Sequence, residues 1–259
     1  MKGPKKDEER LAATLYKLGN AYGNSVQAAK GIDIFIEAVT QFEKLNDPLM
    51  LARTHWSLAL IFMAQTADLR DIPRSVRHLN DGAQALEEDP DVSLLAQIYF
   101  SLSFTSWMTV RPAEGIEWGN KTTVLARDHL LYQYFGAAGM VIGFNMARQG
   151  QVEGGLRLLE GIVRLALTVH QREAASIVSI AVIRLFNHLL DAVRSSEWME
   201  KTEAIKEETV SSNWAAENLG MYVTRPEEVA VRIFVYCLSG ELDKAKDGVN
   251  ELQEVIEES

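Results

Sequence analysis

The side chains best suited to catalysis or metal binding are five histidines that lie singly in the sequence: His55, His78, His129, His170 and His188. An imidazole can ligate a metal ion or transfer a proton near neutral pH. None of the five belongs to an HExxH motif or to a Cys-His spacing typical of metal sites. The sequence also has no phosphate loop, nucleophile elbow or Gly-rich dinucleotide motif. We therefore expect no enzyme here: no catalytic residue, no metal and no cofactor.

A site assembled from residues far apart in the sequence is the alternative. It predicts at least one histidine within hydrogen-bond reach of a carboxylate inside a cleft. The acidic run Glu87, Glu88, Asp89 and Asp91 could hold a cation, but it ends one expected helix and begins the next. Asp91 can accept the free amide protons of that next helix, so we expect a helix cap at this position.

Composition limits the classes of partner. The chain has 259 residues, 47% of them hydrophobic, and a net charge of −10 from 36 acidic and 26 basic residues. A surface that neutralises phosphates is not expected, which argues against nucleic-acid binding. The first residues have no apolar signal segment, and the longest apolar runs, such as 135–144, are far shorter than the ~20 residues of a membrane helix. The single cysteine, Cys237, cannot form a disulfide within the chain, and we expect it to be buried. The chain is therefore predicted to be a cytoplasmic protein without a membrane partner.

Apolar residues recur at helical spacing almost everywhere, so the sequence predicts an all-α fold. Five of the six prolines lie between the apolar-periodic stretches and separate one helix from the next. The resulting helices form six hairpins within one repeat domain that covers residues 1–259. The expected hairpins span residues 7–45, 48–87, 92–127, 130–169, 172–210 and 226–258, with an insert at 210–225.

A twelve-residue spacing between small residues indicates how these helices cross. Small residues at the crossing point let two helices of a hairpin approach each other closely. The pairs are Gly19 with Gly31, Ser103 with Gly115, Gly143 with Gly155, less ideally Ile233 with Ala245, and, after an insertion of four residues, Ala59 with Ser75. The first residues of these pairs follow each other at 40, 44, 40 and 90 residues, a period typical of an α-solenoid. The register of the fifth hairpin, inside the 90-residue gap, is left open.

These residues resemble the tetratricopeptide repeat (TPR), in which a Leu-Gly pair and an aromatic residue on the first helix precede small, large and small residues on the second. The first hairpin matches best, with Leu18, Gly19, Tyr22, Gly31, Phe35 and Ala38. The resemblance covers nearly the whole chain and implies a right-handed superhelix. The long period is similar to that of the divergent repeats in sensor arms of bacterial signalling ATPases, nucleotide cyclases and LuxR-type regulators.

The resemblance also implies a binding surface, because the first helix of each hairpin lines a concave groove in this family. It implies a scaffold that binds a protein or peptide in a signalling or transcription-regulatory system. Aromatic residues and methionines would be anchors, and Asn and Arg would give polar specificity. The expected groove residues are Tyr16, Asn20, Asn24, Arg53, Trp56, Leu60, Met63, Gln97, Phe100, Phe104, Trp107, Met108, Met140, Phe144 and Arg148.

Several alternatives stay open at this point. The aromatic stripe could be core that packs against neighbouring hairpins, in which case Phe104, Trp107 and Phe144 would all be closed to solvent. A small molecule or signalling peptide could enter the same region and change the pitch of the solenoid. The insert at 210–225 could dock a partner through Trp214 and Tyr222, and self-association of the chain is a further possibility.

Overall fold

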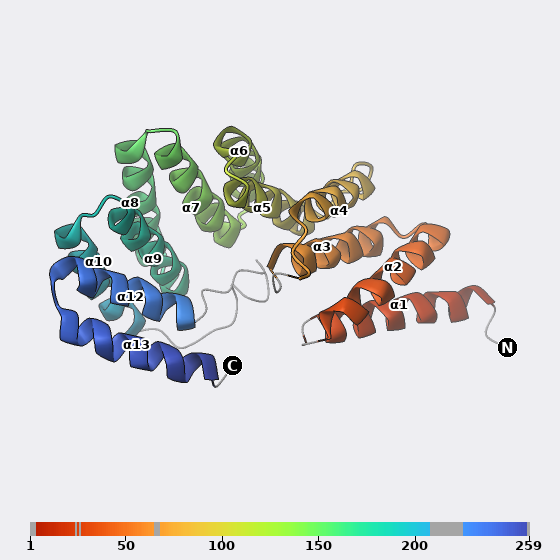
Figure 1. The fold of residues 1–259 in the computed structure, drawn as a ribbon. Helices are drawn as coiled ribbons and strands as arrows, with labels where there is room; N and C mark the ends of the chain where they lie inside the picture. The colour runs from red at the N-terminus through yellow and green to blue at the C-terminus, as the bar shows by residue number, and fades with distance from the viewer. Residues whose placement is uncertain (1–3, 24, 26, 65–67, 208–224, 258–259) are drawn as a thin grey trace. The chain divides into compact units, whose positions relative to one another are not determined.

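Consecutive helices pair into hairpins along the chain (Figure 1). The computed structural model describes residues 4–23, 25, 27–64, 68–207 and 225–257. The predicted insert at 210–225, with Trp214 and Tyr222, lies outside the described residues except for Arg225, and Asn24 lies outside them too. Within the described part the protein is all-α, as predicted, and none of its helices is both long and apolar enough to cross a membrane.

The described chain divides into two compact units, residues 1–131 and 132–259. The first unit contains α1 (Pro4–Gly23), α2 (Ala28–Leu45), α3 (Pro48–Ala64), α4 (Ile72–Ala85), α5 (Val92–Met108) and α6 (Pro112–Asp128). The second contains α7 (Tyr132–Arg148), α8 (Val152–Thr168), α9 (Arg172–His188), α10 (Ala192–Glu207), α12 (Arg225–Ser239) and α13 (Leu242–Glu257). That the whole chain forms a single repeat domain stays a prediction.

Each unit has the layered arrangement of a TPR-like solenoid. The first helices of successive hairpins contact one another, α1 with α3 and α3 with α5 in one unit, and α7 with α9 and α9 with α12 in the other. The second helix of each hairpin packs against its own partner, and α2, α4, α8 and α10 also pack against the first helix that follows. Since an isolated hairpin cannot bury its apolar face alone, this stacking builds a continuous core.

Four of the five predicted helix crossings are confirmed. Ser103 Oγ donates a hydrogen bond of 2.6 Å to the Gly115 carbonyl, and Ser75 Oγ donates one of 2.9 Å to the Ala59 carbonyl. A Cβ atom on Gly31 would lie 2.7 Å from the Gly23 nitrogen and 3.1 Å from the Gly19 oxygen, and one on Gly155 would overlap the Gly143 oxygen. In the last hairpin the close contact of Ile233 is with Gly248.

Helix ends recur at a regular interval in the middle of the chain. Five residues at these ends adopt a left-handed backbone with positive φ: Val110, Leu130, Gly150, His170 and Leu190. After each of them the next amide donates to a carbonyl five residues earlier, as Arg111 N does to Ser106 O at 2.8 Å, which is the Schellman arrangement. Leu190 follows Ile183 by seven residues, as Gly150 follows Gly143, so the fifth hairpin aligns Ile183 and Ser195 with the other pairs.

Two expectations about helices and burial were wrong. The apolar pattern predicts a ninth helix that extends to residue 193, whereas α9 ends at His188 because Leu190 has a left-handed backbone. No Gly or Pro at this position indicates the helix end in the sequence. Cys237 is exposed and not buried. The helix α12 buries Val229 and Val235, and a residue two positions after Val235 points to the opposite side of a helix.

Val110→Gly is expected to raise the free energy of unfolding by about 1 kcal/mol. A β-branched residue at φ 57° has a steric cost that glycine does not, and Val110 is 67% exposed, so little apolar contact is lost. The matched control is Val124→Gly within α6, four residues before its end, which is expected to lower stability by about 0.5–1 kcal/mol. Urea denaturation followed by circular dichroism measures both. A loss of stability in both variants would show that Val110 is not strained.

Candidate functional site

The helices α3 and α5 lie in contact and present a row of half-buried side chains on one face. Trp56 Nε1 donates a hydrogen bond of 3.2 Å to Ser101 Oγ, which in turn donates to the Gln97 carbonyl at 2.9 Å. These bonds fix the indole of Trp56 against α5. We define the α3–α5 face by Arg53, Trp56, Leu60, Gln97, Phe104, Trp107 and Met108, of which Arg53 is exposed and the others are half-buried.

Aromatic rings stack along this face. The ring centroids of Phe100 and Phe104 lie 6.3 Å apart, and those of Phe104 and Trp107 lie 5.3 Å apart. Phe100 is only 1% exposed and anchors the stack in the core, whereas Phe104 and Trp107 are half-buried. The two outer rings therefore have a fixed orientation and keep part of their apolar surface toward solvent, a combination common at protein interfaces.

Three of the predicted groove residues are core residues in this structure. Met63 is 3% exposed, Phe100 is 1% exposed and Met140 is 6% exposed. The helices α3 and α5 are buried around most of their circumference, since polar residues such as Thr54 and Thr105 are buried too. A register taken from the family therefore assigns to the groove some side chains that a neighbouring helix covers.

The other predicted groove residues that the structure describes are partly or fully accessible. Tyr16 is half-buried, with its ring centroid 6.0 Å from that of Phe35, and the Asn20 amide donates to the Tyr16 carbonyl at 2.9 Å. On α7, in the second unit, Phe144 and Arg148 are both accessible. Phe104, Trp107 and Phe144 are thus not closed to solvent.

Charged groups border the α3–α5 face at one end. Arg53 Nη2 lies 3.8 Å from Asp91 Oδ2, and Asp91 Oδ1 accepts the Leu94 amide at 2.9 Å. Asp91 therefore caps α5, as the sequence predicted. Because Asp91 also faces Arg53, the guanidinium is held beside the face without being buried.

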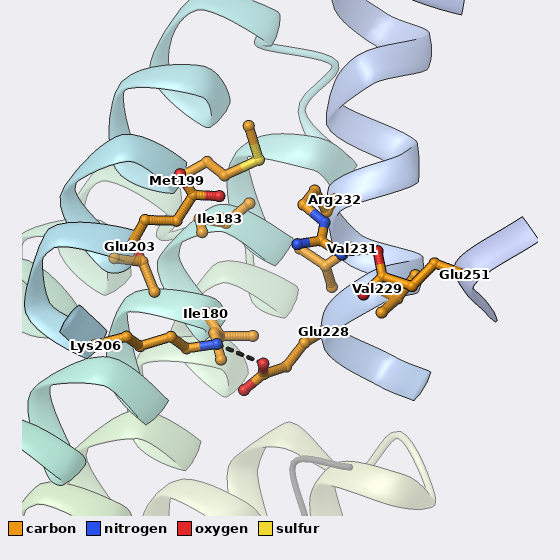
Figure 2. Close-up of a pocket in the computed structure, with 11 residues that line it drawn as sticks. Ile180, Ile183, Met199, Glu203, Lys206, Glu228, Val229, Val231, Arg232 and Glu251 are labelled. Atoms are coloured by element: carbon orange, nitrogen blue, oxygen red, sulfur yellow. Dashed lines mark hydrogen bonds and ion pairs between the residues drawn. The ribbon is translucent and has the colours of Figure 1, made fainter. Parts of the chain in front are cut away.

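A separate pocket of about 290 Å³ lies in the second unit, among α9, α10, α12 and α13 (Figure 2). Its apolar wall includes Ile180, Ile183 and Met199. Two ion pairs bring charge to it, Lys206 with Glu228 and Arg232 with Glu251, each joining two different helices. The pocket therefore combines an apolar wall with charged groups of both signs.

Comparison with known proteins tests the fold. No protein-family model matches the sequence, and no curated protein matches it either. Among solved structures, aspartyl phosphate phosphatase F from Bacillus subtilis is 12% identical with a TM-score of 0.69, over 97% of this chain and 71% of that one. A Rap protein complexed with Competence and Sporulation Factor is 13% identical with a TM-score of 0.70, over 98% of this chain and 67% of that one.

A third similar structure contains the nearly identical TPR-like repeats of a putative kinesin light chain from Podosopora anserina. It is 15% identical with a TM-score of 0.62, over 80% of this chain and 98% of that one. The protein is a TPR-like helical repeat protein. At identities this low the likeness shows the fold alone.

The sequence did not predict one polar cluster inside this TPR-like protein. His55 on α3 and His78 on α4 face each other, with their Nδ1 atoms 3.0 Å apart, and Asp81 lies one turn after His78. The two histidines look isolated in the sequence because they are 23 residues apart. The predicted crossing of Ala59 with Ser75 could have revealed the pair. His55 lies one turn before Ala59 and His78 one turn after Ser75, and in two antiparallel helices such residues are neighbours.

The two imidazoles are held in their neutral forms. Burial is the main cause that lowers the pKa of His55 to about 4, and His78 lowers it further while Asp81 raises it. Burial also lowers the pKa of His78, against the charge of Asp81. At neutral pH one Nδ1–H donates to the other Nδ1, so the pair joins the two helices of the hairpin without a buried charge.

Acidification is expected to destabilise the protein through this histidine pair. Because the folded pKa of His55 lies below the unfolded value of about 6.5, its contribution is complete above pH 6.5 and is lost as the pH falls toward 4. The loss amounts to about 3 kcal/mol at most. Urea denaturation between pH 7 and pH 4 with a chelator, in wild type and His55→Gln, isolates this component. Parallel pH profiles of the two proteins would contradict the assignment.

Proposed function

We propose that this TPR-like protein is a non-catalytic scaffold that binds a protein or peptide partner through the α3–α5 face. The observation that supports this is the stack of Phe104 and Trp107, whose rings are fixed on a core residue and only half-buried. Binding energy in protein interfaces concentrates on a few aromatic and arginine side chains that lose the rest of their water on association. The face has these anchors, and Arg53 and Gln97 beside them supply charge and hydrogen-bonding groups.

The geometry suits a partner segment with its own apolar side chains. A partner helix or an extended peptide could cover Phe104, Trp107 and Leu60 while its polar groups contact Arg53. Since the protein has a net charge of −10, a partner with positive charge outside this contact would associate faster than an acidic one. Nucleic acid is not a partner that this charge favours.

The regulatory setting belongs to the same proposal. We place the protein in a bacterial signalling or transcription-regulatory system, as its interaction or sensor module. Support comes from the shared fold with a Bacillus subtilis aspartyl phosphate phosphatase and with a Rap protein complexed with Competence and Sporulation Factor. Both likenesses extend over nearly the whole chain.

The experiment is a comparison of partner binding by the wild type and by a Phe104→Ala/Trp107→Ala variant. Trp118→Ala is the matched control, because Trp118 is a half-buried tryptophan of the same unit that lies on α6, packs against Tyr99 and is not one of the residues that define the face. Loss of binding in the double variant alone is the expected result, and equal binding by all three proteins would contradict the proposal.

A second candidate function rests on the pocket among α9, α10, α12 and α13. A cavity of about 290 Å³ with an apolar wall and charged groups could hold a small molecule or a residue of a signalling peptide. Met199→Trp, which would place a bulky ring at this pocket, separates the two candidates. It should abolish binding of a ligand in the pocket and leave binding at the α3–α5 face unchanged.

A further inference from the structure

The cluster of His55, His78 and Asp81 in the first unit has the donor set of a metal site. One ligand atom from each residue lies within 4.8 Å of the others. His55 is 7% exposed, and the other two residues are half-buried. Imidazole nitrogen and carboxylate oxygen are ligands for zinc, copper, iron and nickel, and two histidines with one carboxylate form a common set of three.

The spacing of the two imidazoles is close to what a tetrahedral ion requires. Zinc binds imidazole nitrogen at about 2.0–2.1 Å, so two such nitrogens on one ion lie about 3.4 Å apart. The Nδ1 atoms of His55 and His78 are 3.0 Å apart, so small rotations of the rings would admit the ion. Asp81 stands on the same helix as His78, where a change of side-chain rotamer can bring its carboxylate closer.

The surroundings of the cluster fix one of the rings. Phe62 on α3 stacks on the His78 ring with centroids 5.7 Å apart and planes 5° apart, and the Arg74 guanidinium lies 4.3 Å from the Phe62 centroid. The charged groups that act on His78 are Asp81, Arg74 and Arg77, all on α4. Metal binding needs neutral imidazoles, and the lowered pKa of both histidines meets that need at neutral pH.

We propose that His55, His78 and Asp81 bind one divalent transition-metal ion, best tested with zinc, across the α3–α4 hairpin. Three protein ligands leave a fourth position for water or for a group of a bound partner. The ion would link α3 to α4 and so fix the helix that carries Trp56. The proposal does not depend on the proposed partner-binding function, because it concerns a ligand set within one hairpin.

The test is zinc binding to the full-length chain without a polyhistidine tag, after removal of metals with a chelator. A Cys237→Ser background removes the exposed thiol, which could bind zinc by itself. Calorimetric titration with Zn²⁺ should give one ion per chain, and saturating zinc should raise the melting temperature. Binding of Co²⁺ should give the visible absorption bands of a tetrahedral or five-coordinate site.

Three variants locate the ion. We expect His78→Gln and Asp81→Asn to weaken zinc binding by at least about tenfold. Both variants should still fold, because the Gln amide can hydrogen-bond to His55 and because Asp81 is only half-buried. The control is His188→Gln, at the exposed end of α9, which should bind zinc like the parent protein. If the parent protein binds no zinc, or if His78→Gln and His188→Gln bind it equally, the pair is only a hydrogen bond between neutral imidazoles and the proposal is overturned.

Discussion

Gly155→Ala is expected to lower the free energy of unfolding by about 2–3 kcal/mol, although alanine is the better helix former. In the α7–α8 hairpin, a Cβ atom on Gly155 would overlap the carbonyl oxygen of Gly143. The overlapping atom belongs to the backbone of the partner helix, so no side chain can rotate away. The two helices would have to separate, and the apolar contacts of Leu156 and Leu159 would loosen with them.

The matched control lies on the same helix. A Cβ atom on Gly161 meets nothing nearer than the Arg164 guanidinium, at 3.9 Å. Gly161→Ala should therefore raise stability by about 0.5–1 kcal/mol through helix propensity alone. Urea denaturation of the two variants and the wild type, followed by circular dichroism, gives the comparison. If both substitutions stabilise the protein, the close crossing of α7 and α8 at these glycines is wrong.

The architecture could be predicted from the sequence because the small residues at helix crossings have few substitutes. A Cβ atom on Gly31 would lie 2.7 Å from the Gly23 nitrogen, so the glycine at this position reports the close approach of two helices. The register of the fifth hairpin could not be predicted, since the large residue Ile183 stands where the first four hairpins have a small one. The helix end at Leu190 could not be predicted either, because a left-handed backbone is expected at Gly or Asn and not at leucine.

The candidate site could be predicted only in outline. A helix that packs between two neighbouring helices is apolar on most sides. The spacing of its apolar residues therefore does not distinguish Phe100, which is buried, from Phe104, which is half-buried. Which side of α5 is covered depends on the packing of α3 and α6 against it. The histidine pair required the same information, because only the crossing of α3 with α4 brings His55 to His78.

Truncation of the aromatic stack should remove partner binding. Phe104→Ala/Trp107→Ala takes away two rings that stack 5.3 Å apart on the α3–α5 face, and we expect at least about a 100-fold loss of affinity. The loss comes from the apolar area that a partner would cover, since both rings are already oriented before binding. Trp118→Ala removes a comparable ring, one that packs against Tyr99 at 5.3 Å, and should leave affinity unchanged.

The affinity of an identified partner for these three proteins decides whether the α3–α5 face is the binding surface. The partner is captured from the source cell with the wild type and identified, and its dissociation constant is then measured for each protein after circular dichroism has shown that each is folded. We predict tight binding by the wild type and Trp118→Ala and a loss of at least about 100-fold in Phe104→Ala/Trp107→Ala. Equal affinity of the double variant and the wild type would show that the partner binds elsewhere on the protein.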